Sequence, residues 1–296
     1  MKILLTGSSG QLGKEIIDQR PLSFELLLPK RNELDLSNKL NCQNYINFHK
    51  PDFIINAGAF TNVDLAEKES DLCFAINAEA PFIFANAIKE YGGNLLQISS
   101  DYVFDGRKSS PYETKDIRNP ISSYGYSKAK CEEITEEILT PNNQLVILRT
   151  SWLLGHQGKN FLQTMLNLHQ TKNKLKVVSD QIGVMSSTFD LAKICWEIII
   201  NWNIISKKHH IFHRTCQGVS SWFDIAVEIG DIATKYGILE NPAEVTPIKT
   251  KDYNTLAKRP MFSLLDCSGS NGLNNIVCKY WRHELENIIS KIKDKQ

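Results

Sequence analysis

Residues 3–13 read Ile-Leu-Leu-Thr-Gly-Ser-Ser-Gly-Gln-Leu-Gly, and this stretch decides the fold. Its first three residues form an apolar run without polar alternation, which is typical of a strand buried on both faces of a parallel sheet. A glycine-rich turn follows, and beyond it apolar residues recur at helical spacing. A strand, a glycine-rich turn and a helix in this order place backbone N–H groups at a helix N-terminus, where they bind a pyrophosphate. The stretch therefore predicts a dinucleotide-binding unit.

Three glycines of the turn have separate tasks in this interpretation. Gly7 permits a tight turn, Gly10 removes a side chain where the phosphate approaches, and Gly13 lets the helix pack closely on the sheet. The spacing is GxxGxxG rather than GxGxxG, and a flexible loop is the alternative interpretation.

The residues after the second expected strand, 24–28, bear on the choice of cofactor. A site that prefers NAD usually carries an acidic residue here, which binds the ribose 2′-hydroxyl. This chain has Lys30 and Arg31 instead, and their charge suits a 2′-phosphate. We therefore predict NADPH over NADH, with an ordinary solvated basic turn as the alternative. Asp35 and Leu36 are expected near the adenine.

Apolar runs and helical patterns alternate through the first half of the chain. Strands are expected at 53–55, 95–98 and 145–148, and helices near 38–48, 70–91 and 122–138. This alternation predicts an α/β fold, a Rossmann-type doubly wound parallel sheet with helices on both faces. Residues 1–150 are expected to form the dinucleotide-binding domain. Residues 151–296 are expected to form mainly a smaller, discontinuous substrate-binding region, interleaved with segments that return to the first domain.

The composition excludes several classes of protein. Among 296 residues, 34 Lys and Arg face 33 Asp and Glu, for a net charge of +1, which argues against a nucleic-acid binder. The seven cysteines are odd in number and lack a CxxC pair, as in proteins with reduced intracellular thiols. No run approaches the ~18 apolar residues of a membrane span, and the first apolar run is too short for a signal peptide. We expect a cytoplasmic protein that binds neither nucleic acid nor membrane.

A set of polar residues carries the chemistry. Ser99 and Ser100 follow the strand that ends at Ile98, and ligands bind beyond the carboxyl ends of such strands. Tyr124 and Lys128 follow at a spacing of four, so they share one face of a helix. A nearby ammonium favours the phenolate and lowers the pKa of a tyrosine toward the working range. The ordered set predicts a dehydrogenase that exchanges a proton through the tyrosine.

Other polar residues favour structural interpretations. His209, His210 and His213 lie in a strand-like segment whose alternate residues point to opposite faces, so we predict no metal site there. Glu132, Glu133, Glu136 and Glu137 are expected to form a solvated helix face, and the cysteines to be packing residues.

With these motifs in place, the chain resembles the extended short-chain dehydrogenases, and among them the dTDP-4-dehydrorhamnose reductase family. The resemblance covers nearly the whole chain, and its later motifs belong to a sugar-nucleotide pocket. The matching segments are 7–13, 56–64, 99–106, 124–128, 149–152, 160–161, 180–183, 221–222 and 259–260.

The resemblance implies a role for each matching residue. The catalytic set is Ser100, Tyr124 and Lys128, with Ser100 where the family usually has Thr. The cofactor-binding residues are Gly7, Gly10, Gln11, Leu12, Gly13, Lys30, Arg31, Asp35, Leu36, Ala57, Gly58, Ala59, Thr61, Tyr124 and Lys128. The substrate-binding residues are Val63, Ser100, Asp101, Trp152, Asn160 and Arg259. Among these, Val63 and Trp152 match positions beside the deoxysugar, and Arg259 matches a position that clamps the diphosphate.

The implied reaction is NADPH-dependent reduction of the C4 ketone of a nucleotide-linked 4-dehydro-6-deoxyhexose, with dTDP-4-dehydro-L-rhamnose to dTDP-L-rhamnose as the favoured case. UDP in place of dTDP and a talose configuration at C4 are the alternatives that the sequence leaves open. Some members of the family are described with Mg²⁺, but no carboxylate cluster in this sequence identifies its ligands. The sequence allows a homodimer. At 184–187 the chain has Val-Met-Ser-Ser, where the family typically has a small residue, Pro and Thr, so the pocket edge is expected to differ.

Three other functions share part of this pattern. A 4,6-dehydratase needs a carboxylate after Asp101, where this chain has Tyr102, so it is disfavoured. A C4 epimerase shares the Ser-Tyr-Lys set, although 149–152 fits the reductase better. The non-catalytic regulatory subunit of methionine adenosyltransferase also resembles this family, and the segments 151–152, 160–161 and 180–181 favour the reductase over it.

Overall fold

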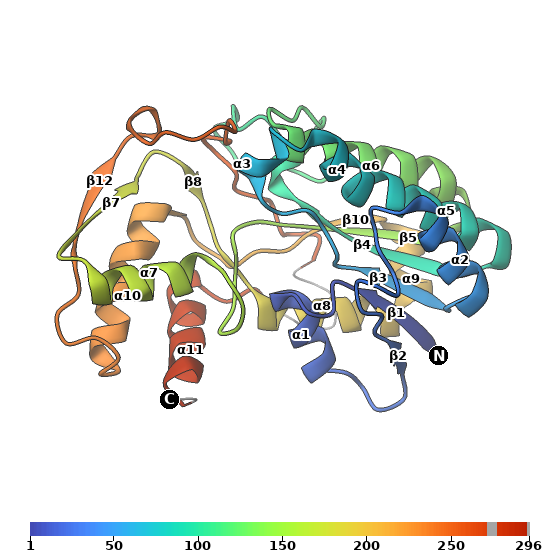
Figure 1. Cartoon of the computed structure of the whole chain (residues 1–296), viewed down its shortest axis with the longest axis horizontal. Coiled ribbons are helices and arrows are strands. Elements are labelled where there is room, and N and C mark those ends of the chain that lie inside the picture. Colours follow the sequence, from blue (N-terminus) through green and yellow to red (C-terminus); the bar gives the residue numbers. More distant parts are fainter. Residues whose placement is uncertain (271–276, 295–296) are drawn as a thin grey trace.

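The computed structural model describes residues 1–270 and 277–294, and a six-stranded sheet lies at its centre (Figure 1). The strands run in the order β10-β5-β4-β3-β1-β2, and every neighbouring pair is parallel. Their bounds are β1 (Lys2–Thr6), β2 (Glu25–Leu27), β3 (Phe53–Asn56), β4 (Asn94–Ser100), β5 (Leu145–Thr150) and β10 (Ile211–His213). The prediction of a Rossmann-type doubly wound parallel sheet is confirmed.

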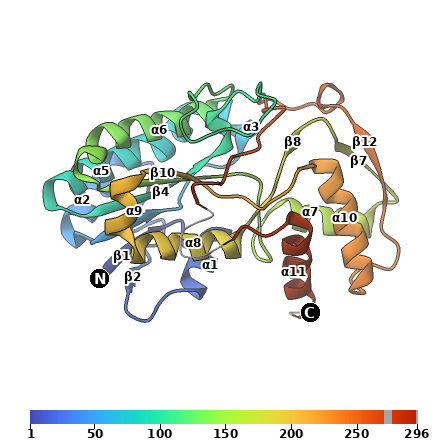
Figure 2. The same cartoon turned by 180° about the vertical axis from the view of Figure 1, so that it is seen from behind.

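Helices cover both faces of this sheet (Figures 1 and 2). On one face lie α2 (Lys39–His49), α5 (Ala80–Tyr91) and α6 (Ser123–Leu139). On the other lie α1 (Gln11–Asp18), α8 (Thr188–Ile200) and α9 (Trp202–Lys208). Successive residues of one strand enter opposite cores: Leu4 packs in the core with α2 and α5, whereas Ile3 and Leu5 pack in the core with α1 and α8. Burial on both faces explains the uninterrupted apolar runs.

The chain between β3 and β4 forms one nearly continuous helical segment. It contains α3 (Val63–Ala66), α4 (Ser70–Phe74), the π-helical turn η1 (Ala75–Glu79) and α5. Among the described residues, 70–91 is the one helical stretch long and apolar enough to cross a membrane, and 56% of its most apolar window is buried inside the protein. Packing of α5 between α2 and α6 accounts for that apolar composition.

The rest of the chain builds a second lobe with its own core (Figure 2). Its helices are α7 (Phe161–Thr171), α10 (Trp222–Lys235) and α11 (Trp281–Lys293). Short strands pair as β6 (Leu153–Leu154) with β9 (Ser186–Ser187), β8 (Ile182–Gly183) with β11 (Ser220–Ser221), and β7 (Lys174–Val178) with β12 (Glu244–Ile248). The short helices η2 (Asp101–Val103), η3 (Thr140–Asn142) and η4 (Thr250–Asp252) lie in connections. Within 188–213 the chain returns to the first lobe, because α8 packs on α1 and β10 pairs with β5.

Candidate active site

A cavity of about 620 Å³ lies beyond the carboxyl ends of β1, β2 and β3. Gly7, in the turn after β1, has a φ of +68°, and a Cβ there would approach Gly58 N to 2.7 Å. Only glycine fits this position, so the backbone stays open to the cavity. The predicted cofactor residues among its lining are Gly7, Lys30, Arg31, Asp35, Leu36, Gly58 and Ala59. Two cations beside a glycine turn fit the phosphates of NADPH.

Other predicted cofactor residues support this cavity without lining it. Gly13 packs so tightly that a Cβ would lie 2.2 Å from Gly7 O, and Leu12 is buried in the core. Gly10 is the N-cap of α1. Gln11 Nε2 donates a hydrogen bond to Leu153 O at 3.2 Å, which links the turn to the second lobe. Ala57 is packed against the core and Thr61 is exposed, and the last two predicted cofactor residues, Tyr124 and Lys128, lie on α6.

The three predicted catalytic residues all lie where β4 meets α6. Ser100 ends β4, and Tyr124 and Lys128 lie one turn apart on α6. All three are buried, with 7%, 9% and 4% of their surface exposed. The Ser122 side chain caps α6 by accepting a hydrogen bond from Gly125 N at 3.2 Å, and this cap fixes where the helix begins. Lys128 Nζ donates to Ile98 O, inside β4, at 2.9 Å.

The protonation of this group differs from our expectation. We predicted that Lys128 lowers the pKa of Tyr124, but in the chain by itself burial dominates and raises that pKa. A hydrogen bond with Ser100 acts in the opposite direction and lowers it. Burial likewise lowers the pKa of Lys128. Burial thus favours the neutral phenol of Tyr124 and opposes the charged form of Lys128.

Asp101, predicted to bind substrate, is buried beside Ser100 and interacts with it directly. Ser100 Oγ donates to Asp101 Oδ1 at 2.9 Å and accepts a hydrogen bond from Tyr102 N at 3.2 Å. Burial raises the pKa of Asp101 to about 7, against the lowering effect of hydrogen bonds from Ser100 and Ser263. This carboxyl group consequently titrates near neutral pH.

The two predicted deoxysugar residues, Val63 and Trp152, lie in different hydrophobic clusters. Val63, at the start of α3, packs against the cluster that contains Tyr124. Trp152 stacks on Trp222, with ring centroids 4.0 Å apart. Its φ of +43° is rare for a bulky residue, and a Cβ on Gly183 would lie 2.7 Å from its ring. The stack presents an aromatic wall from the second lobe.

Arg259 and Asn160 have protein partners. The Arg259 guanidinium binds the Asp64 carboxylate through contacts of 2.6 and 3.2 Å, and this arginine holds the pKa of Asp64 below its usual range. Asn160 caps α7 by accepting from Gln163 N at 3.0 Å, and its amide donates to Gly155 O at 2.8 Å. The Asn160 amide also donates to Gln11 Oε1 at 3.2 Å, so it joins the start of α7 to the glycine turn, whereas Arg259 is paired with the Asp64 carboxylate.

The departure at 184–187 lies in the interior rather than at an exposed pocket edge. Val184 and Met185 are buried in the core of the second lobe. Ser186 and Ser187 form the buried strand β9, and Ser186 Oγ accepts a hydrogen bond from Thr150 Oγ1 at 2.7 Å. These residues therefore join the two lobes.

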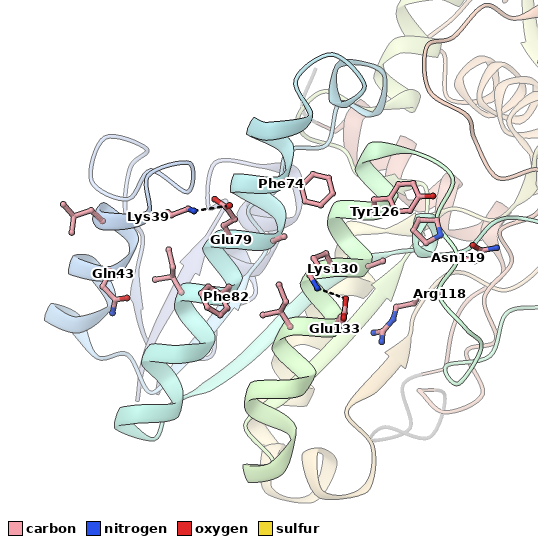
Figure 3. A pocket seen from close by; sticks show the side chains of 16 residues that line it. Lys39, Gln43, Phe74, Glu79, Phe82, Arg118, Asn119, Tyr126, Lys130 and Glu133 are labelled. Carbon is pink, nitrogen blue, oxygen red and sulfur yellow. Dashed lines mark hydrogen bonds and ion pairs between the residues drawn. The ribbon is translucent and has the colours of Figure 1, made fainter.

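A larger hollow of about 1090 Å³ lies on the far side of α6 (Figure 3). There α6 contributes Tyr126, Lys130 and Glu133, while α2 and the 74–83 segment form the other wall. Tyr124 and Lys128 are not among its lining residues. The helix thus has two distinct sides, and the predicted catalytic residues belong to the side facing the sheet.

Our prediction of a solvated glutamate face on α6 is wrong for Glu132. Its carboxylate is fully buried and binds Arg149 of β5 at 2.7, 2.9 and 3.2 Å. Glu136, one turn later, is partly buried against Arg118 and His210, whereas Glu133 is exposed and pairs with Lys130. The spacing of four from Tyr124 through Lys128 to Glu132 was the signal that places them on one face.

The histidines of the 209–213 segment contact neighbouring side chains, and the cysteines form no disulfide bonds. His210 Nε2 lies 2.9 Å from Glu136 Oε1, and His213 Nε2 lies 3.2 Å from Arg149 Nη1. Within 1–270 and 277–294, no group of three or more His, Cys, Asp or Glu side chains is arranged to hold a metal ion. All seven cysteines are free thiols.

Comparison with known proteins agrees with this arrangement. The family model described as the RmlD substrate binding domain matches residues 1–294. A dTDP-4-dehydrorhamnose reductase of Aggregatibacter actinomycetemcomitans is 38% identical over 295 residues, covering 97% of this chain and 98% of its own.

Two solved structures extend the comparison. A dTDP-4-dehydrorhamnose reductase from Clostridium acetobutylicum superposes with a TM-score of 0.89 at 37% identity, over 99% of this chain and 100% of its own. The Bacillus anthracis dTDP-4-dehydrorhamnose reductase, solved in complex with NADP, has a TM-score of 0.87 at 31% identity, over 98% of this chain and 99% of its own. By match, identity and coverage, this chain belongs to the RmlD substrate-binding-domain family, the family of the dTDP-4-dehydrorhamnose reductases.

Proposed function

We propose that this protein reduces the C4 ketone of a nucleotide-linked 4-dehydro-6-deoxyhexose with NADPH, and that the substrate is dTDP-4-dehydro-L-rhamnose. The observation that carries the proposal is that Ser100, at the end of β4, and Tyr124 and Lys128, one turn apart on α6, are buried where this strand meets this helix, while the glycine-turn cavity lies at the ends of the neighbouring strands. The name shared by the relatives supplies the substrate class. A cytoplasmic location suits an enzyme that consumes NADPH.

NADPH, when bound, supplies the hydride that goes to C4. Tyr124 holds the proton that the C4 oxygen receives as its negative charge develops. Ser100 donates a hydrogen bond to the same oxygen, and for this its hydroxyl turns away from Asp101, its present acceptor. Protonation of Asp101, whose pKa is about 7, favours that turn because a neutral carboxyl group is a weaker acceptor.

The rest of the pocket serves binding. Lys30 and Arg31, which line the cavity beyond β2, bind the 2′-phosphate of the cofactor. Arg259 exchanges Asp64 for the diphosphate of the substrate, since its planar fork binds either anion with two hydrogen bonds. Trp152 provides an apolar face against which a deoxysugar packs.

The test is NADPH absorbance decay with purified protein and dTDP-4-dehydro-L-rhamnose, for wild type and Tyr124→Phe. We expect sugar-dependent oxidation that falls about 10²- to 10⁴-fold in the variant, because general-acid catalysis is lost. Tyr126→Phe is the matched control: Tyr126 lies on the same helix but is 54% exposed on the far side, so its removal leaves the rate unchanged.

Two outcomes contradict the proposal. NADPH binding without turnover on this sugar favours a non-catalytic, NADP-binding regulatory role. Interconversion of two C4 epimers without net NADPH oxidation favours an epimerase.

A further inference from the structure

The buried ion pair between Arg149 and Glu132 has no role in the proposed reaction as described so far. Arg149 of β5 grips Glu132 of α6 with Nε and Nη2, and both side chains are at most 1% exposed. The register of the sheet sets Arg149 beside Ser99 on one neighbouring strand and beside His213 on the other. The pair therefore lies directly behind the catalytic residues, one helical turn beyond Lys128.

The Glu132 carboxylate affects the pKa of Lys128 because both side chains are buried and lie near each other. The two residues are four apart on the sheet-facing side of α6, and both are buried. Burial lowers the pKa of Lys128, and the Glu132 carboxylate opposes this by favouring the ammonium. The titratable groups that face Lys128 are Cys131 and Glu132 of its own helix and Cys73 of α4. Among them, Glu132 is the one whose pKa is held low, so it is the resident negative charge.

Arg149 counterbalances that charge and keeps it in place. Burial raises the pKa of Glu132, but the charge and hydrogen bonds of Arg149, together with Ser99 and Arg118, outweigh burial and lower that pKa. Arg149 also donates to Thr114 O at 3.2 Å and lies 5.1 Å from the centre of the Phe104 ring. Arg118 contacts the same carboxylate at 3.2 Å, so Glu132 retains a cation even without Arg149.

We propose that Glu132 and Arg149 are positioning residues that set the electrostatic potential at Lys128 and Tyr124 and so fix the pH at which the catalytic pair loses its proton. The inference rests on the proposed function. Loss of the Glu132 charge makes the electrostatic potential at Lys128 and Tyr124 more positive. A more positive potential lowers the pKa of both groups, so the fall of kcat at high pH (the basic limb of the profile) begins at a lower pH. Loss of the Arg149 charge moves that limb to higher pH.

The experiment compares kcat against pH for wild type, Glu132→Gln, Arg149→Met and the double variant. We expect the basic limbs of the two single variants to shift in opposite directions, separated by about 0.5 pH units or more, with the double variant between them. Glu136→Gln is the matched control, because it removes a charge one turn farther along the same helix. Its limb stays near that of wild type.

The outcomes separate the inference from its premise. If Glu132→Gln does not fold, the double variant replaces it, and its limb must lie below that of Arg149→Met. If the basic limbs of the variants coincide with that of wild type and only the size of kcat falls, the inference is overturned. The pair would then have a purely structural role. Absence of turnover in the wild type would instead refute the proposed reaction, and with it any role of the pair in that reaction.

Discussion

Two arginine–carboxylate pairs of this protein are each held by two nitrogens of the guanidinium at similar distances, but in opposite surroundings. Arg149 meets Glu132 at 2.7 Å with side-chain exposures of 1% and 0%. Arg259 meets Asp64 at 2.6 Å with exposures of 21% and 36%. The first pair is sealed between β5 and α6, whereas the second joins α3 to the 256–262 segment, where water reaches both partners.

The difference teaches what each pair can do. A charge in the sealed pair has no water to replace its partner, so the pair is permanent and acts on its neighbours through the interior. In the half-exposed pair, solvent or another anion can take the place of the carboxylate at small cost. The same kind of contact is thus fixed where the protein seals it and open to exchange where water reaches it.

The largest effect is expected from breaking the sealed pair. Glu132→Ala leaves Arg149 without its main counter-charge and should lower the free energy of unfolding by about 3–5 kcal/mol. Urea denaturation measures it, with Glu133→Ala as the control, since Glu133 is exposed on the same helix. If both variants lose equally little free energy of unfolding, the prediction is contradicted, and the interior tolerates Arg149 without its carboxylate partner.

A smaller effect is expected from His213, which shares the sealed environment. Burial, followed by the nearby Arg149, lowers the pKa of His213 to about 4, from 6.5 for a free histidine. Because the unfolded chain binds this proton first, stability is fully present above about pH 6.5 and falls as the pH drops toward 4. Between these pH values wild type should lose about 2–3 kcal/mol more than His213→Gln in urea titrations. Parallel curves for the two proteins would show that His213 gains its proton without cost.

The smallest effect is expected at the half-exposed pair. Asp64→Asn should change the free energy of unfolding by about 1 kcal/mol or less, because water screens the contact.

Arg259→Met should raise KM for the sugar nucleotide about tenfold while kcat changes little, as expected for a residue that binds substrate and transition state equally. Steady-state kinetics at saturating NADPH separates the two constants. A fall in kcat with constant KM would place Arg259 outside the diphosphate site.

The elements that local patterns specify could be predicted from the sequence. The strand, glycine turn and helix at 2–18, the alternating βα units and the parallel sheet are confirmed. The family is confirmed as well, because its motifs are short and contiguous. The roles of Ser100, Tyr124 and Lys128 remain predictions, although the fold brings them together as their spacing implied.

What could not be predicted depends on residues far apart in the chain. The sequence predicts a solvated face for Glu132 because no residue near it in the chain indicates its partner. That partner, Arg149, lies 17 residues later on β5. The pairing of Asp64 with Arg259, 195 residues apart, and the stack of Trp152 on Trp222 within the second lobe likewise follow only from the tertiary fold.

The sequence by itself determined which backbone each segment adopts, since turn geometry and apolar periodicity act within a few residues. Tertiary structure alone decided which charges lost their water and which kept it. Burial of a charged group is a property of everything packed around it, and that packing fixes the pKa of each group and the partner each arginine holds.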